Sequence, residues 1–577
     1  MAIKSAGAFS LVLHSHLPYV ISHGRWPHGT DWLNEAAAET YIPILNVVNE
    51  LADEGIEAKL SIGISPVLAE QLADDSFKEE FVSYCGEKIT AAEEDEKQFR
   101  KHGRDLMIEL SVMWQKYYRG ILDSFENRYH KDIIKGFREL QDKGYIEIMT
   151  CGATHGYFPL LSQDTSIQAQ VKMAVRSHKR HFGKDPLGIW LPEAAYRPSY
   201  DWKPPVESNV GEKPYHRKAV EEFLSENGIR YFIVDSALLK GGKSIGVYID
   251  RFEALKQLWG QFEREYQPRE EDKEKSPHEV YLVGEHEGKR PVSLFSRDPN
   301  TGLQVWSGEH GYPGDGNYLD FHKKHFPGGH RYWKVTSAKA DLADKMIYYP
   351  KDANDRLVDN AAHFADMISG IVRDYHEKTG KQGILCAPFD AELFGHWWFE
   401  GPRFIKEVYK NLAKLKDVGV ATLTEQMEHH KPTRVISIPE GSWGKGGYHY
   451  IWLNKWTEWT WKHIYNDELT MRDLAREYKK SDNQTFKDIV EQLARELMLL
   501  SASDWQFLIS TWAARDYAEL RLTEHHESFM RLAELAKKVL DGQSLDERDK
   551  ALLHDIKEKD KLFIDIDPAW FAEVEYP

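Results

Sequence analysis

Short apolar runs, each followed at once by polar residues, recur along this 577-residue chain and constrain its fold more than any other feature. Runs of four to six residues without alternation are typical of strands that are buried on both faces. Helical stretches separate several of them, for example at residues 217–226. This alternation predicts an α/β fold with a closed parallel barrel. The runs cover residues 10–13, 58–62, 146–150, 188–191, 231–234, 292–295, 384–387 and 420–423.

A His, Asp or Glu lies at or just past the carboxyl end of nearly every one of these runs. Catalysis on parallel barrels takes place where the carboxyl ends of the strands meet. The fold alone does not require this pattern, because many strand-to-helix loops begin with plain turn residues. The runs therefore predict an active site as well as a barrel.

Two segments interrupt the strand–helix rhythm. Residues 75–142 are charged and helical, and we expect a helical insertion that packs Trp114, Tyr117 and Tyr118 inward. Residues 262–279 are dense in charge and predict a solvated loop.

The pattern changes again toward the carboxyl end of the chain. Residues 308–317 are rich in Gly and Pro and predict a long loop near the barrel mouth. After about residue 425, amphipathic helices follow, including 483–501 and 516–540. The expected division is a catalytic barrel over 1–425 with an insertion at 75–142, and a helical domain over 426–577 that completes the active-site cleft.

Composition narrows the class of partner. The formal net charge of −17 argues against a nucleic-acid or polyphosphate partner and favours a neutral substrate. No apolar stretch reaches the roughly 18 residues of a membrane span, and the start of the chain lacks a secretory apolar region. The cysteines, Cys85, Cys151 and Cys386, are odd in number and far apart, which indicates a reducing, cytoplasmic location. We expect Cys151 and Cys386 in the core.

Two acids follow apolar strands and precede aromatic residues: Glu193 in GIWLPEAAYRP and Asp390 in CAPFDAELFGHWWFEGP. Glycoside chemistry needs two carboxyl groups across the scissile bond, one to attack and one to protonate the leaving oxygen. An apolar setting keeps such an acid protonated. Either acid alone could equally be a helix cap or an ion-pair partner, but the matched contexts favour catalysis. Candidates for the apolar setting of Asp390 are Phe389, Phe394, Trp397 and Trp398.

His14 and His16 in LHSHLPYV lie two apart on one strand end, and His155 follows another strand. Side chains two apart on a strand point the same way. Three imidazoles could bind zinc, or they could hydrogen-bond to sugar hydroxyls directly. Spacing alone leaves both possibilities open.

Tryptophan is concentrated from the end of the predicted barrel onward: of 18 in the chain, seven lie between residues 397 and 461. Sugar rings stack their apolar faces on aromatic planes. For Trp456, Trp459 and Trp461, however, the spacing favours packing between the barrel and the helical domain.

Five motifs, in order, carry a family resemblance: LVLHSHLPYV, EIMTCGATHGYFPLL, GIWLPEAAYRP, APFDAELFGHWWFEGP and SASDWQFLI. Together they resemble glycoside hydrolase family 57, in particular its branching enzymes, over most of the chain. The resemblance implies an incomplete (β/α)7 barrel with a helical insertion and a carboxy-terminal α-helical domain. It also implies a retaining mechanism with no metal and no other cofactor.

The resemblance assigns roles to individual residues. It implies Glu193 as the nucleophile and Asp390 as the acid/base. It places Tyr248, in GGKSIGVYID, in a mobile loop over the acceptor side. If Tyr248 does not have this role, Tyr312 in the Gly- and Pro-rich loop 308–317 is the next candidate. The residues implied to contact sugar are His14, His16, His155, Trp306, Trp443, Trp452 and Asp504.

The function implied is 1,4-α-glucan branching, in which an α-1,4 linkage is cleaved and the chain is transferred to a 6-hydroxyl. The expected substrate is an α-1,4-glucan such as amylose or glycogen, and the expected state is a monomer or small homo-oligomer. An α-amylase or a 4-α-glucanotransferase would use the same site. A metal-dependent carbohydrate deacetylase with His14, His16 and His155 around an ion belongs to another class. A silent glucan-binding protein is disfavoured, because both carboxyl groups are present in full motifs.

Overall fold

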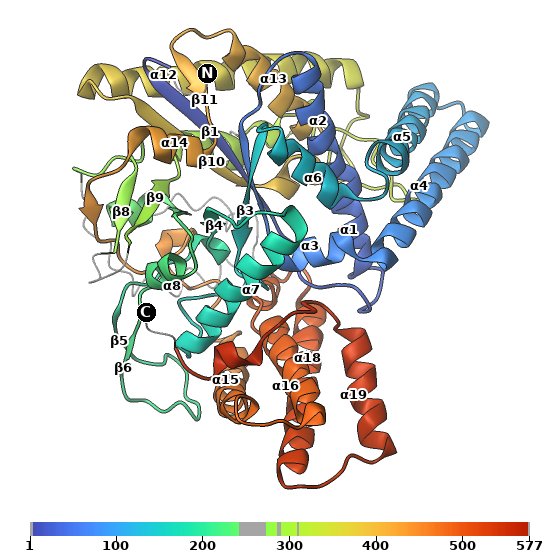
Figure 1. Ribbon diagram of the computed structural model, residues 1–577. Coiled ribbons are helices and arrows are strands. Elements are labelled where there is room, and N and C mark those ends of the chain that lie inside the picture. Colours follow the sequence, from blue (N-terminus) through green and yellow to red (C-terminus); the bar gives the residue numbers. More distant parts are fainter. Residues whose placement is uncertain (1–3, 242–272, 285–289, 308–310, 338, 575–577) are drawn as a thin grey trace.

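The computed structural model describes residues 4–241, 273–284, 290–307, 311–337 and 339–574 (Figure 1). Tyr248 and most of the charged segment 262–279 lie outside the described residues. Within the described ranges, no helix has the length and apolar character needed to cross a membrane.

The barrel is a curled sheet whose parallel strands neighbour one another in the order β10–β1–β2–β3–β4–β7–β9. Each neighbouring pair in this series is parallel. All nine residues of β1 are buried, which explains why its sequence does not alternate. The strands are β1 (Gly7–Ser15), β2 (Leu60–Ile64), β3 (Ile146–Cys151), β4 (Gly188–Trp190), β7 (Tyr231–Val234), β9 (Val292–Ser296) and β10 (Gly383–Asp390).

The barrel is incomplete, so the closed barrel expected from the strand pattern is wrong and the (β/α)7 form implied by the resemblance is confirmed. Between β9 and β10 only an isolated bridge, Arg297 to Cys386, is formed in the described part of the chain. The edge of β9 that would pair with β10 is taken by the antiparallel strand β8 (Tyr281–Val283). Strand β12 (Val435–Ile436) then extends the sheet beyond β8.

Two predicted boundaries are corrected. The run 420–423 is a strand only at its start, because β11 (Val418–Val420) ends there and Thr422 caps helix α14 (Leu423–His430). The predicted helix 217–226 begins only at Val220, as α8 (Val220–Glu226). Its first residue belongs instead to β6 (Tyr215–Arg217), which pairs with β5 (Tyr200–Trp202).

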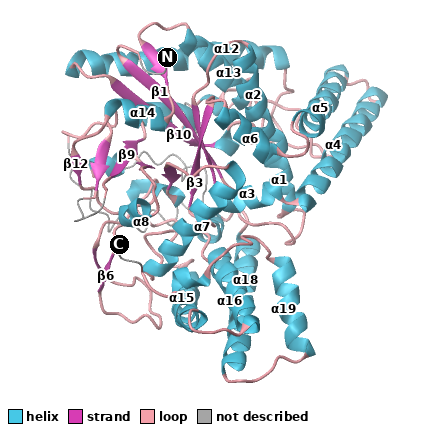
Figure 2. Ribbon diagram, viewed as in Figure 1, coloured by secondary structure: helices cyan, strands magenta, loops and turns pink. Residues whose placement is uncertain are grey.

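Helices surround the strands on the outside (Figure 2). They include α2 (Ile42–Asp53), α3 (Pro66–Ala73), α7 (Asp164–Phe182), α12 (Pro350–Thr379) and α13 (Gly401–Ala413). As expected, Cys151 and Cys386 are buried, and they belong to a core cluster formed mainly by side chains of the barrel strands.

Residues 75–142 are helical, as predicted. Helices α4 (Asp75–Lys101) and α5 (Asp105–Asp123) pack together beside the barrel (Figure 1), and α6 (Ile133–Asp142) leads back to the sheet. Trp114 and Tyr118 are buried and Tyr117 is partly buried, so the expected inward packing is confirmed.

The carboxy-terminal helices lie below the barrel in Figure 1. Two of them, α16 and α18, match the predicted segments 483–501 and 516–540 to within a residue. Trp461 is fully buried, which confirms its packing role. The helices are α15 (Glu458–Tyr478), α16 (Gln484–Leu500), α17 (Asp504–Thr511), α18 (Arg515–Leu540) and α19 (Glu547–Lys559).

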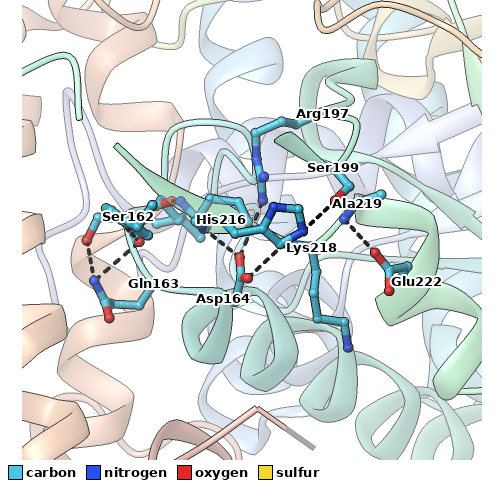
Figure 3. A network of polar contacts seen from close by, with 12 residues as sticks. Ser162, Gln163, Asp164, Arg197, Ser199, His216, Lys218, Ala219 and Glu222 are labelled. Carbon is cyan, nitrogen blue, oxygen red and sulfur yellow. Dashed lines mark hydrogen bonds and ion pairs between the residues drawn. The ribbon is translucent and has the colours of Figure 1, made fainter. Parts of the chain in front are cut away.

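A polar network ties the β5–β6 hairpin to the start of α7 (Figure 3), and Glu468 extends it to α15. The Asp164 carboxylate accepts hydrogen bonds from Arg217 Nε at 2.6 Å and from the Lys218 backbone at 2.9 Å. Glu468 of α15 accepts hydrogen bonds from the backbone and hydroxyl of Ser162, at 2.8 and 2.6 Å. The barrel and the carboxy-terminal helices are therefore joined by buried hydrogen bonds as well as by apolar packing.

Candidate active site

A pocket of about 530 Å³ opens at the carboxyl ends of the strands. That volume is ordinary for a small-molecule or oligomer site. Its lining combines residues from the strand ends with residues that follow the barrel in sequence. The strand-end residues are His14, His16, His155, Glu193, Arg297 and Asp390, and the later ones include Trp443, Trp452 and Asp504.

Glu193 sits on a strained turn just after β4. Its φ of 58° and ψ of 25° place it in the left-handed region, which only a few per cent of non-glycine residues occupy. The Trp443 indole Nε1 donates a hydrogen bond to Glu193 Oε2 at 2.8 Å, and Ser503 Oγ donates to Oε1 at 3.4 Å. Burial raises the pKa of Glu193 to about 7, the charge of Asp504 adds to that rise, and the Trp443 hydrogen bond opposes it. The carboxyl is thus oriented and half-ionised near neutral pH.

Asp390 is the last residue of β10 and stands opposite His14 in the β1–β10 register. Burial raises the pKa of the Asp390 carboxyl well above its usual value, and the neighbouring charges of Glu392 and Glu193 raise it further. Arg297, whose guanidinium pairs with Asp235 at 2.5 Å, opposes this rise. Asp390 is therefore held in the protonated form that a general acid needs.

The three predicted histidines come together. His14 Nε2 and His155 Nε2 are 3.1 Å apart, and the rings of His16 and His155 stack with centroids 3.9 Å apart. Burial lowers the pKa of His14 and of His155 well below the usual value, so both rings are neutral. His16 Nε2 faces Asp504 at 2.9 Å, and its Nδ1 faces Ser65 Oγ at 2.9 Å.

The histidines do not form one ligand set around a common point. The residue groups of this site that could hold an ion are His14 with Cys151 and His155, and His16 with His155 and Asp504. Within the described ranges a third group, His23 with His525 and Asp560, lies outside the lining of this pocket. Both ring nitrogens of His16 already have hydrogen-bonding partners in Asp504 and Ser65. The arrangement suits neutral hydrogen-bonding groups better than a three-histidine metal centre.

The predicted tryptophans line the pocket. Trp306 ends helix α11 (Pro299–Trp306), Trp443 bonds to Glu193, and Trp452 stacks on Tyr157 with ring centroids 4.6 Å apart. Trp443 therefore acts on a catalytic candidate as well as lining the pocket.

Tyr312, the second candidate for the tyrosine over the acceptor side, is buried in the core, so that prediction is wrong. It is only 5% exposed and packs against Phe364 and Phe404. Its hydroxyl lies 2.6 Å from His363 Nδ1. A residue held in the core in this way cannot serve as a cover over the site.

Several lining residues were not singled out from the sequence. Glu392 accepts hydrogen bonds from the His16 backbone at 3.1 Å and from the Tyr41 hydroxyl at 2.5 Å. The sequence feature that could have identified Glu392 is its position two residues after Asp390. Trp32 and Arg297 also line the pocket. Ser503, which is next to Asp504 but not among the lining residues, has its hydroxyl 2.8 Å from His155 Nδ1.

Two carboxyl groups at the mouth of an incomplete barrel, among tryptophans and neutral histidines, define an enzyme that acts on glycosidic bonds. The chain matches the glycosyl hydrolase family 57 model over residues 10–439, and the model of the carboxy-terminal region of 1,4-alpha-glucan branching enzymes over 463–571. The chain belongs to glycosyl hydrolase family 57.

Individual relatives agree with this assignment. The chain is 41% identical over 559 residues to a 1,4-alpha-glucan branching enzyme from Thermococcus kodakarensis, covering 96% of this chain and 77% of that one. The crystal structure of that Thermococcus protein superposes with a TM-score of 0.89 at 38% identity, covering 99% and 98% of the two chains. An α-amylase from Thermotoga maritima superposes with a TM-score of 0.80 at 26% identity, over the whole of both chains.

Proposed function

We propose that this chain is a 1,4-α-glucan branching enzyme in which Glu193 is the nucleophile and Asp390 the acid/base. The named relatives and the match to the carboxy-terminal region of branching enzymes support the activity. The assignment of the two roles is supported by one observation: Glu193 and Asp390 line the same pocket, but their carboxyl groups differ in hydrogen bonding and in neighbouring charge. Glu193 is hydrogen-bonded by Trp443, whereas Asp390 has no such donor among the described contacts and faces the charge of Glu392.

In the first step, the Glu193 carboxylate attacks the anomeric carbon of an α-1,4-linked glucose. Asp390 gives its proton to the glycosidic oxygen, the carbon–oxygen bond breaks, and the reducing-end part of the glucan departs. The product is a glycosyl ester on Glu193. The hydrogen bonds from Trp443 and Ser503 hold the carboxylate in place for this attack.

In the second step, Asp390, now ionised, takes the proton of an incoming 6-hydroxyl. The hydroxyl oxygen attacks the anomeric carbon, the ester to Glu193 breaks, and an α-1,6 branch forms with the α configuration retained. Both carboxyl groups return to their starting protonation.

The remaining site residues act on the substrate. His14, His16 and His155 line the pocket, and Asp504 is hydrogen-bonded to His16. Trp306, Trp443 and Trp452 supply aromatic surface for sugar rings. The neutral rings of His14 and His155 exchange hydrogen bonds with sugar hydroxyls without adding charge to the site.

Our proposal includes three further assignments that are based on the sequence. The first is the division into a barrel over 1–425, with its insertion at 75–142, and a helical domain over 426–577. The second is a role for Tyr248 on the acceptor side, and the third is a cytoplasmic location.

Analysis of the linkages made from amylose tests the activity. Proton NMR of the products should show new α-1,6 anomeric signals, with few new reducing ends. A rise in reducing ends without α-1,6 signals would identify an α-amylase. Redistribution of chain lengths through α-1,4 bonds alone would identify a 4-α-glucanotransferase.

A further inference from the structure

Trp512 occupies a conformation that a tryptophan rarely adopts. It terminates helix α17 with φ 59° and ψ 17°, the left-handed geometry in which helices usually end on glycine. Its side chain is also 55% exposed, so burial does not compensate for the strain. Other non-glycine residues with positive φ include His155 and Glu193 of the active site, and also residues away from it such as Lys59, His130 and Lys431.

The ring of Trp512 is nevertheless fixed. It lies against Trp456 with ring centroids 5.6 Å apart and an interplanar angle of 50°. The Arg515 guanidinium lies 5.5 Å from the Trp512 ring centroid and is itself held by Glu519 at 2.8 Å.

The segment that carries Trp456 is anchored to α17. The buried Asn454 accepts a hydrogen bond from the Trp456 backbone at 2.9 Å and donates one to Ser510 Oγ at 2.9 Å. The Ser510 hydroxyl donates in turn to the Ile451 carbonyl at 2.6 Å. The two rings therefore form a preorganised pair built from two chain segments.

The pair lies at the edge of the catalytic pocket. Ala513 and Ala514, which follow Trp512 directly, line that pocket, and so does Leu508 of α17. On the other segment, Ile451 and Trp452 line it as well. Both chain segments that carry the pair therefore also supply residues to the lining of the pocket.

We propose that Trp456 and Trp512 form a binding platform for a stretch of α-1,4-glucan that extends beyond the catalytic pocket. This inference rests on the proposed function, since the occupant is a continuation of the chain held by the pocket. Aromatic faces stack on the apolar faces of glucose rings, and exposed rigid rings bind with little loss of conformational freedom. Because pocket and platform would hold one chain, the second contact would be intramolecular and would favour long glucans.

Calorimetric titration of the Glu193→Gln variant, which binds without turnover, tests the platform. The ligands are amylose and maltotriose, a ligand short enough to be held within the pocket. In this background Trp512→Gly suits the observed φ and removes the ring, whereas Trp512→Phe keeps a ring. Phe326→Ala, at an aromatic residue that is 67% exposed and does not line the pocket, is the matched control.

We expect Trp512→Gly to weaken amylose binding about two- to tenfold and to change maltotriose binding less than about twofold. Trp512→Phe should recover most of the amylose affinity, and Phe326→Ala should change neither affinity. Equal amylose affinity in Trp512→Gly and its parent, or an equal loss for both ligands, overturns the platform alone. Failure of the Glu193→Gln parent to bind amylose at all would overturn the proposed function and the platform together.

Discussion

Trp443 Nε1 donates a hydrogen bond of 2.8 Å to Glu193 Oε2, and the Trp443 backbone donates a second one to the Glu193 carbonyl at 3.2 Å. A residue beyond the barrel strands thus fixes the side chain and the strained backbone of the proposed nucleophile. The hydrogen bond also favours the ionised carboxylate, because it acts to lower the pKa of Glu193.

Trp443→Phe should therefore lower kcat about 10- to 100-fold, the effect of losing one hydrogen bond to a charged group. It should also move the acid limb of the pH–rate profile to higher pH, because the pKa of Glu193 rises further without this donor. Steady-state rates from pH 4 to 9 measure both effects. Trp333→Phe, at a partly buried tryptophan outside the pocket, serves as the control. An acid limb that stays in place would exclude an electrostatic role for Trp443.

Glu193→Gln and Asp390→Asn should each reduce turnover by ~10²–10⁴ or more, since each removes either the nucleophile or the proton donor. Both changes are nearly isosteric, and each removes a group that is costly to ionise when buried, so the melting temperature should not fall. Initial rates on amylose together with thermal melts distinguish loss of chemistry from loss of fold. A variant that keeps more than about a tenth of the activity, a loss below roughly 1.4 kcal/mol, would not carry the assigned role.

The pH dependence of kcat/KM follows from the raised pKa values of Glu193 and Asp390. Glu193 must be ionised to attack, and its pKa is raised to about 7, so the rate should fall as the pH drops below neutrality. Asp390 must be protonated, and burial raises its pKa well above the usual value, so the rate should fall again as the pH rises through that raised pKa. The two limbs report the coupled pair rather than either residue alone.

Asp504→Asn provides a directional test of this electrostatic account. The charge of Asp504 raises the pKa of Glu193, so its removal should move the acid limb to lower pH. Asp516→Asn, at an exposed residue on α18, should leave the limb where it is. A shift in the opposite direction would show that the contact of Asp504 with His16, rather than its charge, controls Glu193.

The sequence was most informative where a local pattern has one physical meaning. Buried parallel strands need uninterrupted apolar runs, so β1, β3 and β10 could be placed from their residues alone. Catalytic acids at strand ends likewise follow from the barrel, which is why Glu193 and Asp390 could be selected together.

Contacts between distant segments were not accessible in this way. Trp443 is 250 residues from Glu193 in sequence, and no local pattern indicates that its indole reaches that carboxylate. The loop composition around Tyr312 suggested a mobile cover, but the packing of its ring against Phe364 and Phe404 is tertiary. The exposure and strain of Trp512 depend on how α17 ends, which the sequence pattern did not indicate.

The most direct test of the central claim is to trap the glycosyl ester on Glu193. An Asp390→Asn variant given a maltosyl fluoride, whose leaving group needs no proton, should form the intermediate but break it down slowly. Mass spectrometry of the digested protein should then find one maltosyl unit on the peptide that contains Glu193. A maltosyl unit on another residue, or fluoride release with no adduct at any time, would contradict the mechanism.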